Sequence, residues 1–435
     1  MLFIFLAYIQ CKYGVVIDAG SSGTRVDIYQ MDVKKKTRNI SLVLHETIKI
    51  KISDCVQNED LIEKLGSEVL KKLDVEYLQK EAKKTQLYFY ATAGMRKFTS
   101  DEQNKVMSKM YAYLKANSKF IITQEHVRVI GGYEEGIFGW ISINYLYGLL
   151  DSTTSAMSDM GGASLEITYE VSPKAVLNST ENFYDITDHF TKSKKRVFSY
   201  SYMGYGVNSA FAKVYDHLIE TSNNNDNKIE NPCFYKGYEE SYKDVTFTGT
   251  SDVEKCTELI REINLNTTNK SVELPFIQEQ STFTMISYFS YIVVGYLGKK
   301  SADFTLEDME EGIKKLDGLT FEEECQRHPS IGKEYLYQYF YALIYLYLTI
   351  TEKYQLDSTK TFRAPSEING KDISWAVGVV IADVKPAKPQ LQWYYCILIV
   401  LSVLIVIGII GFIIFYLKKK KNTEQKSSIS SNLLQ

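Results

Sequence analysis

Apolar and polar positions along the chain follow two periods, one typical of strands and the other typical of helices. Short apolar, β-rich runs predict strands at residues 15–18, 25–31, 85–90, 127–130 and 372–381. Apolar residues spaced three and four apart predict helices at residues 61–84, 100–116, 133–150, 281–297 and 334–347. The polar stretch 220–244 is typical of a surface loop. Strands that alternate with helices predict an α/β fold.

One strand–turn–strand design occurs twice, in GVVIDAGSSGTRVDIYQM from Gly14 and in SAMSDMGGASLEITYEV from Ser155. A Gly- and Ser-rich turn points backbone N–H groups and hydroxyls into one concavity that suits phosphate oxygens. A single Asp-x-Gly turn is ordinarily a plain β-turn, but the duplication favours two turns that hold a phosphate chain between them.

An aspartate stands at the same place in each turn, Asp18 in the first and Asp159 in the second. A polyphosphate needs a hard divalent cation, and Mg²⁺ or Ca²⁺ prefers oxygen ligands and often keeps its waters. The pair is therefore the candidate site for a hydrated Mg²⁺ or Ca²⁺.

Two further motifs supply candidate side chains. In ATAGMRK, which follows a predicted strand, Thr92 and Ala93 can offer a hydroxyl and an N–H to phosphate, and Arg96 can brace the loop. GGYEEGIFGW places Glu134 and Glu135 at the start of a helix. Carboxylates there either favour the positive end of the helix dipole or take a proton from an attacking water, and the spacing does not choose between these roles.

Composition and missing motifs narrow the class of protein. The 435 residues, 45% hydrophobic and 24% charged, are typical of a globular protein with two or three domains. A net charge of −3 and short basic clusters disfavour nucleic acid as a partner. The chain has no GxxxxGK[ST] or GxSxG motif, and its five histidines lack zinc-site spacing.

The uncharged run 393–417 is long enough to cross a bilayer. Lys418 to Lys421 follow it and predict a cytoplasmic tail at 418–435. Residues 1–11 fit a signal peptide or a truncated N-terminal anchor. The residues between these segments are therefore expected to be extracellular or lumenal, at the plasma membrane or an internal membrane.

Cysteines and sequons agree with an outward location. Four cysteines fall in this region and allow three pairings, of which Cys233 with Cys256, close in sequence and flanked by turns, is the candidate disulfide. Four N-x-S/T sequons precede the membrane run, as a glycoprotein requires, at Asn39, Asn178, Asn266 and Asn269.

Five stretches in order resemble the signatures of the ectonucleoside triphosphate diphosphohydrolase, or apyrase, family. They are IDAGSSGTR, YATAGMRK, GGYEEGIFGWISIN, SDMGGASLEI and a weaker ISWAVG, and they span nearly the whole region before the membrane run. The resemblance implies a two-lobed, actin-like fold of duplicated ribonuclease H type with the active site between the lobes. Lobe I would comprise 12–132 plus 366–390, and lobe II 133–365.

The resemblance also implies roles for individual residues. Glu135 would be the catalytic base, Ser164 would help to position the attacking water, and Asp18 and Asp159 would hold the metal through water. Tyr291 and Tyr335 would stack on the nucleobase, with core packing as the alternative for each. The two turns and the segment after the strand at 85–90 would bind phosphate. These residues are Ser21, Ser22, Gly23, Thr24, Thr92, Ala93, Gly161, Gly162 and Ala163. The cysteine segments of the family match the pairing of Cys233 with Cys256.

The chain departs from the family pattern in two places. Glu166 stands where the family usually has Gln, and this extra carboxylate beside the water would tune the metal preference or the orientation of the water. Leu336 stands where many members have cysteine, which leaves Cys325 without that partner, and Cys55 has no evident partner.

The expected function is that of a membrane-anchored apyrase that hydrolyses terminal phosphates of nucleoside tri- and diphosphates with Mg²⁺ or Ca²⁺. A Golgi or endosomal nucleoside diphosphatase of the same family is the alternative. A kinase on the same fold and an inactive binding ectodomain are the other classes. Free phosphate released from ATP without an acceptor separates hydrolase from kinase.

Overall fold

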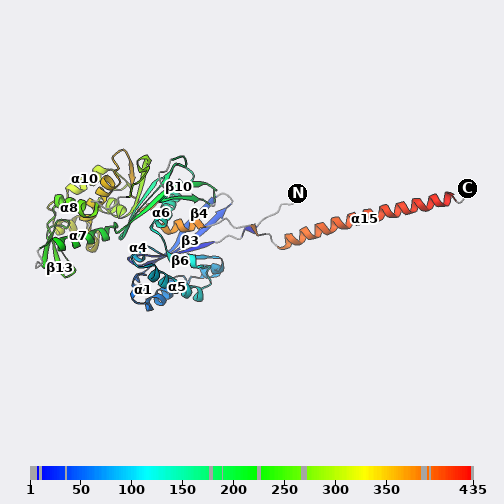
Figure 1. Cartoon of the computed structure of the whole chain (residues 1–435), viewed down its shortest axis with the longest axis horizontal. Helices are drawn as coiled ribbons and strands as arrows, with labels where there is room; N and C mark the ends of the chain where they lie inside the picture. The colour runs from blue at the N-terminus through cyan, green and yellow to red at the C-terminus, as the bar shows by residue number, and fades with distance from the viewer. Residues whose placement is uncertain are drawn as a thin grey trace. The chain divides into compact units, whose positions relative to one another are not determined.

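The computed structural model describes residues 7–8, 12–34, 37–175, 180–188, 190–222, 227–265, 272–383, 389–390 and 393–432. The chain forms two compact units, Cys11–Lys385 on the one hand and Met1–Gln10 with Pro386–Gln435 on the other. The larger unit is mixed α/β and contains two large sheets (Figure 1).

The first sheet has five strands in the order β4-β3-β2-β5-β6. Their bounds are Tyr13–Ala19 (β2), Thr24–Lys34 (β3), Thr37–Ile48 (β4), Gln86–Ala91 (β5) and Val127–Val129 (β6). β2 runs antiparallel to β3 and parallel to β5, and Asp18 pairs with Arg25 on one side and Tyr90 on the other. The strands predicted at 15–18, 25–31, 85–90 and 127–130 are confirmed.

The second sheet repeats this arrangement within seven strands, in the order β15-β16-β14-β7-β8-β10-β9. The bounds are Ala156–Met160 (β7), Ser164–Val171 (β8), Phe183–Thr187 (β9), Lys194–Met203 (β10), Thr282–Ser287 (β14), Asp303–Phe304 (β15) and Thr361–Arg363 (β16). β7 runs antiparallel to β8 and parallel to β14, so Asp159 pairs with Glu166 and with Ile286. The two hairpins thus occupy equivalent places in their sheets.

Two helices fill the space between the sheets, α6 (Gly132–Leu146) and α14 (Trp375–Asp383). α14 packs on α6 and β2, whereas α6 packs on β8 and β10. Their side chains form one core with both sheets, in which Trp140 and Trp375 lie with Val16 and Met157. This shared layer joins the two hairpins into one body.

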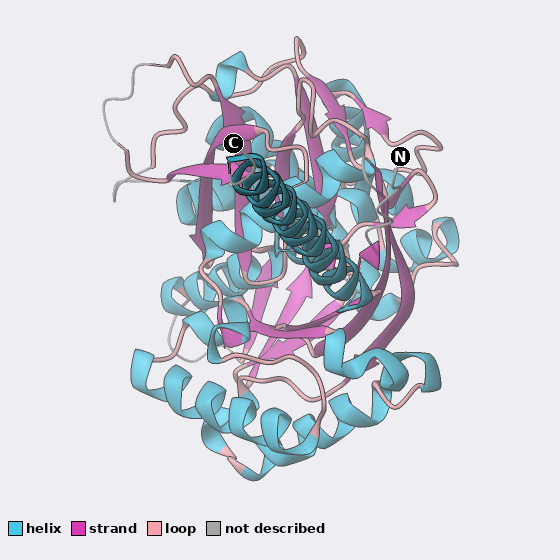
Figure 2. Ribbon diagram, turned by 90° about the vertical axis from the view of Figure 1, so that its right-hand side faces the viewer, coloured by secondary structure: helices cyan, strands magenta, loops and turns pink. Residues whose placement is uncertain are grey.

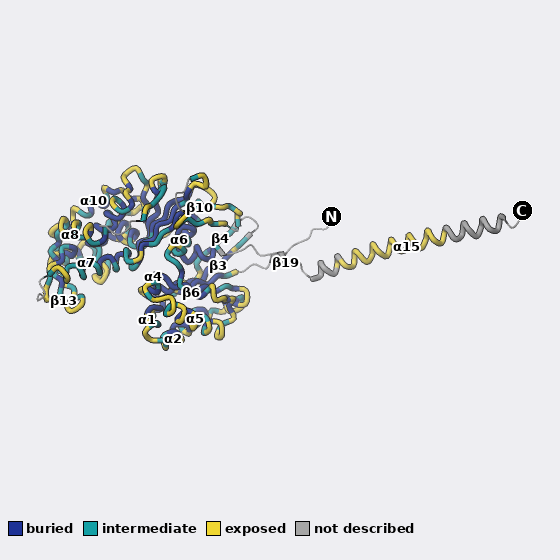
Figure 3. The backbone as a smooth tube through the Cα atoms, in the orientation of Figure 1, coloured by how far each residue is buried: buried dark blue, intermediate teal, exposed yellow. Residues whose placement is uncertain are grey.

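Other helices cover the outer faces of both sheets, and the strands between these helices and the central layer are the most buried part of the unit (Figures 2 and 3). The first sheet carries α1 (Asp54–Gln57), α2 (Asp60–Lys72), α3 (Glu76–Glu81), α4 (Ala93–Arg96) and α5 (Ser100–Asn117). The second carries α7 (Val207–Thr221), α8 (Val253–Ile260), α9 (Tyr288–Ser290), α10 (Leu306–Lys314), α11 (Phe321–Arg327), α12 (Lys333–Leu336) and α13 (Tyr339–Leu348). The predicted helices at 100–116 and 133–150 are confirmed. The one at 61–84 is divided between α2 and α3, and the one at 334–347 is divided between α12 and α13.

Three expectations from the sequence were wrong. Residues 372–381 were predicted as a strand but are mostly the helix α14. The prediction failed because a helix enclosed between a sheet and α6 is apolar all round and shows no helical period. The stretch 281–297 begins as strand β14 and becomes helical only after Ser287. Within 220–244, β11 (Lys228–Asn231) and β12 (Glu239–Tyr242) join β13 (Val245–Gly249) in a three-stranded sheet.

The smaller unit contains the strand pair β1 (Ala7–Tyr8) and β19 (Pro389–Gln390) and the helix α15 (Trp393–Asn432). Within α15, Val400–Lys420 is long and apolar enough to cross a membrane. This span overlaps the predicted run 393–417. The leader predicted at residues 1–11 falls mostly outside the described residues, as do the sequons at Asn178, Asn266 and Asn269.

Candidate active site

The two predicted phosphate turns are closed by equivalent backbone hydrogen bonds. In the first, the N–H of Gly20 donates to the carbonyl of Gly23 (3.0 Å), and in the second the N–H of Gly161 donates to the carbonyl of Ser164 (3.0 Å). A φ of +154° at Gly23 is available to glycine and rare for other residues. Two tight turns therefore stand at equivalent strand ends of two sheets.

The tips of these turns present free backbone donors. Within the part of the chain that the structure describes, no backbone carbonyl accepts from the N–H groups of Ser21, Ser22, Gly162 or Ala163. Ser21 and Ser22 are also exposed. Successive N–H groups without acceptors are what an anion-binding concavity requires. Thr24 is different, because it is fully buried and its hydroxyl donates to the carbonyl of Ile50 (2.9 Å), which anchors the turn.

Each turn is supported by a neighbouring segment. Thr92 is buried, and its N–H donates to the carbonyl of Ala19 (3.3 Å) beside the first turn. At the second turn, the N–H of Val207, the first residue of α7, donates to the carbonyl of Gly161 (2.9 Å). Ala93, also buried, opens α4 beside the first turn.

Asp18 is 7% exposed and forms an ion pair with Arg25 through one carboxylate oxygen, at 2.9 Å. Its other oxygen, Oδ1, is buried without a hydrogen-bond partner. Burial raises the pKa of Asp18 to about 6, although Arg25 opposes this shift. Oδ1 of Asp18 is therefore available to accept a hydrogen bond or to interact with a cation.

Asp159 stands at the matching place in the second hairpin. Burial raises its pKa as well, while a hydrogen bond from Ser287 and the charge of Arg25 oppose the shift. Arg25 belongs to the first hairpin, so its charge acts on the aspartates of both hairpins. Ser287 has a φ of +63°, an uncommon value for a non-glycine residue, at the point where β14 ends.

Glu134 and Glu135 have different surroundings, although they are adjacent at the start of α6. Glu134 accepts from the N–H of Gly131 (2.8 Å) and pairs with both terminal nitrogens of Arg128, so it caps the helix. Glu135 pairs instead with Arg96 and is 13% exposed. The structure thus gives the capping role to Glu134, while Glu135 contacts Arg96.

Glu135 shares Arg96 with Glu166. The guanidinium of Arg96 lies 3.6 Å from the Glu166 carboxylate and donates to the carbonyl of Ile130 (3.1 Å), while Ser201 donates to Glu166 (2.7 Å). Burial raises the pKa of Glu166 to about 7. Burial also raises the pKa of Glu135 well above its usual value, and the charge of Glu166 adds to this effect. Ser164, at the start of β8, is buried and hydrogen-bonds to Glu166.

The donor set fits a hydrated divalent cation. Asp18 and Asp159 each add to the pKa shift of Glu135, so these carboxylates face one region. Among the described residues, no three His, Cys, Asp or Glu side chains come close enough to hold a metal directly. Two aspartates from opposite hairpins, one with an orphaned oxygen, suit an oxygen-preferring ion that keeps its waters.

The predicted base-stacking tyrosines are both exposed. Tyr291 is 55% exposed and Tyr335 is 60% exposed, which excludes core packing for both. Burial is the largest cause of the raised pKa of Tyr339, and Tyr291 and Tyr335 are the next two causes. Both tyrosines therefore lie near the hydroxyl of Tyr339. Tyr291 also contributes to the raised pKa of Arg25 in the first hairpin.

Reasoning from the sequence missed several neighbours of this site. Arg25 pairs with Asp18, Ser201 binds Glu166, and the amide of Asn208 lies beside Gly162. Arg25 was within a recognised motif and its pairing follows from the hairpin register. Ser201 and Asn208 carry no local signal, because the pairing of β10 with β8 brings Ser201 beside Glu166 and the packing of α7 brings Asn208 beside Gly162.

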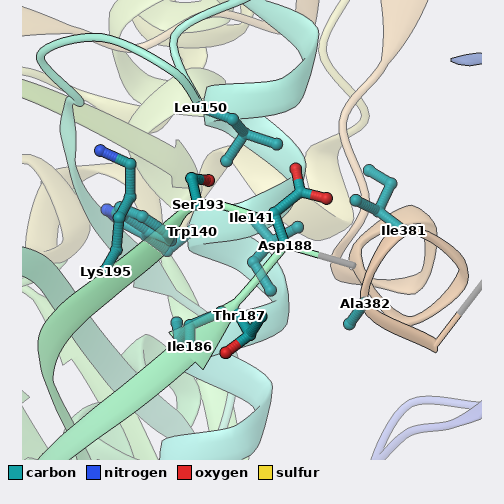
Figure 4. A pocket seen from close by; sticks show the side chains of 10 residues that line it. All are labelled: Trp140, Ile141, Leu150, Ile186, Thr187, Asp188, Ser193, Lys195, Ile381 and Ala382. Carbon is teal, nitrogen blue, oxygen red and sulfur yellow. The ribbon is translucent and has the colours of Figure 1, made fainter. Parts of the chain in front are cut away.

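A separate hollow lies between α6, α14 and β9–β10 (Figure 4). It contains none of the predicted site residues and its walls are largely apolar, with Asp188 and Lys195 as the charged lining residues. It is not suited to a phosphate chain. The ten lining residues are Trp140, Ile141, Leu150, Ile186, Thr187, Asp188, Ser193, Lys195, Ile381 and Ala382.

The structure contains the disulfide between Cys233 and Cys256, with the Cα atoms 4.9 Å apart. Cys55 and Cys325 are free thiols. Leu336 is fully buried in the core of the second sheet.

Comparisons with known proteins agree with this fold. A crystal structure of nucleoside triphosphate hydrolases from Neospora caninum aligns with a TM-score of 0.63 and 15% identity, covering 85% of this chain and 92% of that one. The fold therefore belongs to the class of two-lobed α/β proteins predicted from the sequence.

The sequence profile of the GDA1/CD39 (nucleoside phosphatase) family matches residues 7–393, and the chain belongs to this family. The Golgi apyrase of Schizosaccharomyces pombe is 31% identical over 275 residues, which are 57% of this chain and 48% of that protein. The chain thus matches about half the length of that relative. Ectonucleoside triphosphate diphosphohydrolase 1 of Mus musculus is 26% identical over 88% of this chain and 83% of its own. The predicted family and enzyme class, a nucleoside phosphatase, are confirmed.

Proposed function

We propose that this nucleoside phosphatase hydrolyses the terminal phosphate of nucleoside tri- and diphosphates in the gap between its two hairpins. The observation that carries the proposal is the convergence of Asp18, Asp159, Glu135 and Glu166 beside two matching turns with free N–H groups. Phosphoryl transfer depends mainly on positioning and charge neutralisation, and this arrangement supplies both.

Glu135 takes a proton from the attacking water as the oxygen of that water bonds to the terminal phosphorus. The bond to the bridging oxygen breaks, and the shortened nucleotide leaves with that oxygen. Arg96 fixes the carboxylate of Glu135, while Ser164 and Glu166 orient the water. The free N–H groups of the turns, with Thr92 and Ala93, neutralise charge on the phosphoryl oxygens.

Asp18 and Asp159 would hold a divalent cation, Mg²⁺ or Ca²⁺, through its water ligands. Such an ion supplies positive charge to the phosphate oxygens when bound. The orphaned Oδ1 of Asp18 and the raised pKa values of both aspartates support this role, because each carboxylate is short of a positive partner.

Tyr291 and Tyr335 present exposed rings that we assign to the nucleobase. The two lobes are assigned to 12–132 with 366–390 and to 133–365, which gives each lobe one of the two large sheets and one of the central helices. We further propose that Val400–Lys420 anchors the chain with its C-terminus in the cytoplasm, because Lys418 to Lys421 stand at its end. The large unit then faces the cell exterior or an organelle lumen.

The deciding experiment measures phosphate release from ATP, ADP, GDP and UDP with and without Mg²⁺ or Ca²⁺. We expect cation-dependent release by the wild type and a loss of about 10²- to 10⁴-fold in kcat for Glu135→Gln. The matched control is Glu134→Gln, on the same helix turn, which removes a cap and leaves kcat near the wild-type value. Equal rates for wild type and Glu135→Gln would refute the assignment of the base.

A further inference from the structure

Two lysines from distant parts of the chain meet at one tyrosine ring. Lys213 Nζ in α7 lies 4.4 Å from the centroid of Tyr205, and Lys353 Nζ, at the end of the π-helix η6 (Thr349–Lys353), lies 4.3 Å from it. Lys353 Nζ is also 4.0 Å from the ring of Tyr202. Tyr202 is buried, so this cluster has an aromatic floor.

No carboxylate neutralises the pair within the described residues. Neither lysine takes part in an ion pair or hydrogen bond there, although Lys195 pairs with Glu170 at 2.8 Å and Lys243 with Asp216 at 2.7 Å. Burial lowers the pKa of Lys353 to about 8, and the charge of Lys213 adds to the shift. Burial alone accounts for the lowered pKa of Lys213. Two half-buried ammonium groups that repel each other lack a counter-charge.

The cluster lies on the face of the second sheet opposite to Glu166. Ser201 and Tyr202 are adjacent in β10, and adjacent strand residues point to opposite faces. Ser201 binds Glu166, so Tyr202 and the two lysines face away from the catalytic carboxylates. An anion held there would not occupy the phosphate turns.

The cluster is nevertheless joined to the second phosphate turn through the backbone around Tyr205. The N–H of Gly204 donates to the carbonyl of Ala163 (2.9 Å), and a Cβ on Gly206 would stand only 2.4 Å from the nitrogen of Ala163. The carbonyl of Tyr205 accepts from the hydroxyl of Tyr345 (2.8 Å). A ligand that holds Tyr205 in place would therefore also hold residues 204–206 against the turn at Gly161–Ser164.

We propose that Lys213, Lys353 and Tyr205 form a second anion site, separate from the substrate phosphates, for a small tetrahedral oxyanion of the phosphate or sulfate class. The two ammonium groups supply charge-assisted donors to the anion. Its negative charge relieves their repulsion and holds residues 204–206 against the turn at Gly161–Ser164. This site goes beyond the hydrolytic function and does not depend on it.

The first test uses the full chain in detergent and follows thermal unfolding while sodium sulfate replaces sodium chloride at constant ionic strength. A ligand that binds the folded state raises the Tm in a saturable manner. We expect such a rise in the wild type above the general sulfate effect, and its loss in Lys213→Gln and in Lys353→Gln. Lys243→Gln is the matched control, since Lys243 also lies over a tyrosine ring, at 5.2 Å, but has a carboxylate partner. An equal sulfate response in all four chains would overturn the proposal.

The second test needs no substitution at the lysines. Lys213 and Lys353 of the wild-type chain are acetylated with acetic anhydride in sulfate or chloride, and the modified peptides are quantified by mass spectrometry. At sulfate ten times above its dissociation constant, mass action leaves about one site in ten free, so modification slows about tenfold. Lys243 should be modified equally in both salts. Equal rates at Lys213 and Lys353 in both salts would refute the site even if the variants fail to fold. Inorganic phosphate replaces sulfate in a parallel series to establish which oxyanion binds more tightly.

Discussion

At the scale of single residues, the feature that governs the site is one guanidinium shared by two buried carboxylates. Arg96 contacts Glu135 and lies 3.6 Å from Glu166. Burial raises the pKa of both acids, and the charge of Glu166 adds to the shift of Glu135. A base must be deprotonated to accept a proton from water. Arg96 thus preserves the charged form of Glu135 in a place where burial disfavours it.

Arg96→Gln tests this role through pH. Without the guanidinium of Arg96, the pKa of Glu135 and that of Glu166 both rise. The acidic limb of the kcat/KM profile should therefore move to higher pH by about one to three units. Uncompensated buried charge should also lower the free energy of unfolding by about 3–5 kcal/mol. Arg128→Gln is the control. It removes the partner of Glu134, the neighbour of Glu135 in α6, and should leave the position of the acidic limb unchanged. A limb unmoved in Arg96→Gln would show that Glu135 is not the titrating base.

At the scale of elements, the second phosphate turn depends on the close approach of α7. Gly206 caps this helix, and a Cβ there would meet backbone atoms of Gly162 and Ala163 at 2.4–2.5 Å. Backbone cannot rotate away as a flexible side chain can, so any substitution must displace the helix or the turn.

Gly206→Ala should therefore lower the free energy of unfolding by about 1–3 kcal/mol through overpacking and reduce the hydrolysis rate. Urea unfolding and phosphate release measure the two effects. Gly295→Ala, in the π-helix η5 (Tyr291–Tyr296), is the control, because its added Cβ would meet no atom within 4 Å. Equal rates for both variants would mean that the turn tolerates displacement.

The disulfide is the second element-scale feature. It joins Cys233 to Cys256, which are 23 residues apart. The loop between them contains β12 and β13, two of the three strands of the sheet β11-β13-β12. The buried residues Phe234 and Tyr235 follow directly after the first cysteine and pack in the core of the second sheet. The bond thus secures an otherwise polar segment to that core.

The double substitution Cys233→Ala with Cys256→Ala should cost about 3 kcal/mol, since the unfolded chain gains the entropy of an open loop. The Tm of the oxidised wild type and of the variant measures this loss. Cys325→Ala, which removes a free and half-buried thiol, should change the Tm much less. Because the catalytic carboxylates lie elsewhere, hydrolysis well below the Tm should remain.

At the scale of the whole molecule, two similar hairpins become one site because α6 and α14 hold their sheets together. The core between the sheets takes residues from both hairpins and from both helices. A Cβ on Gly378 in α14 would stand 1.9 Å from the carbonyl oxygen of Phe138 in α6, so these helices cross with backbone close to backbone. Such close crossing fixes the spacing of the two sheets.

The membrane helix gives the prediction that belongs to the complete chain. The span Val400–Lys420 has 21 residues, about 30 Å of helix, which matches the hydrocarbon core of a bilayer. The full chain should remain in the membrane pellet after alkaline carbonate extraction. Ile405→Arg with Ile409→Arg should release it, because each arginine near the centre costs about 2.5–3.5 kcal/mol. Ile405→Leu with Ile409→Leu should stay in the pellet, and release of this control would argue against a spanning helix.

The sequence alone predicted the elements with a clear period and the turns with a clear chemistry. The hairpins at Asp18 and Asp159 were visible because their strands alternate and their Gly- and Ser-rich turns repeat. The helix at 375–383 was mistaken for a strand because burial on all sides removes the polar face that marks a helix. Likewise, β14 was hidden in an apolar run that continues into a helix.

What the sequence determined by itself is therefore the list of chemical groups: two turns, four carboxylates, an arginine and an apolar run long enough to span a membrane. Local order is enough for these, since each depends on neighbours a few residues away. Only the tertiary structure decided that Glu134 caps a helix while Glu135 faces Arg96, and that Ser201 and Asn208 join the second turn. It alone brought Lys213 and Lys353 to one ring. These outcomes depend on contacts between segments far apart in the chain, which strand pairing and helix packing create and which no local pattern encodes.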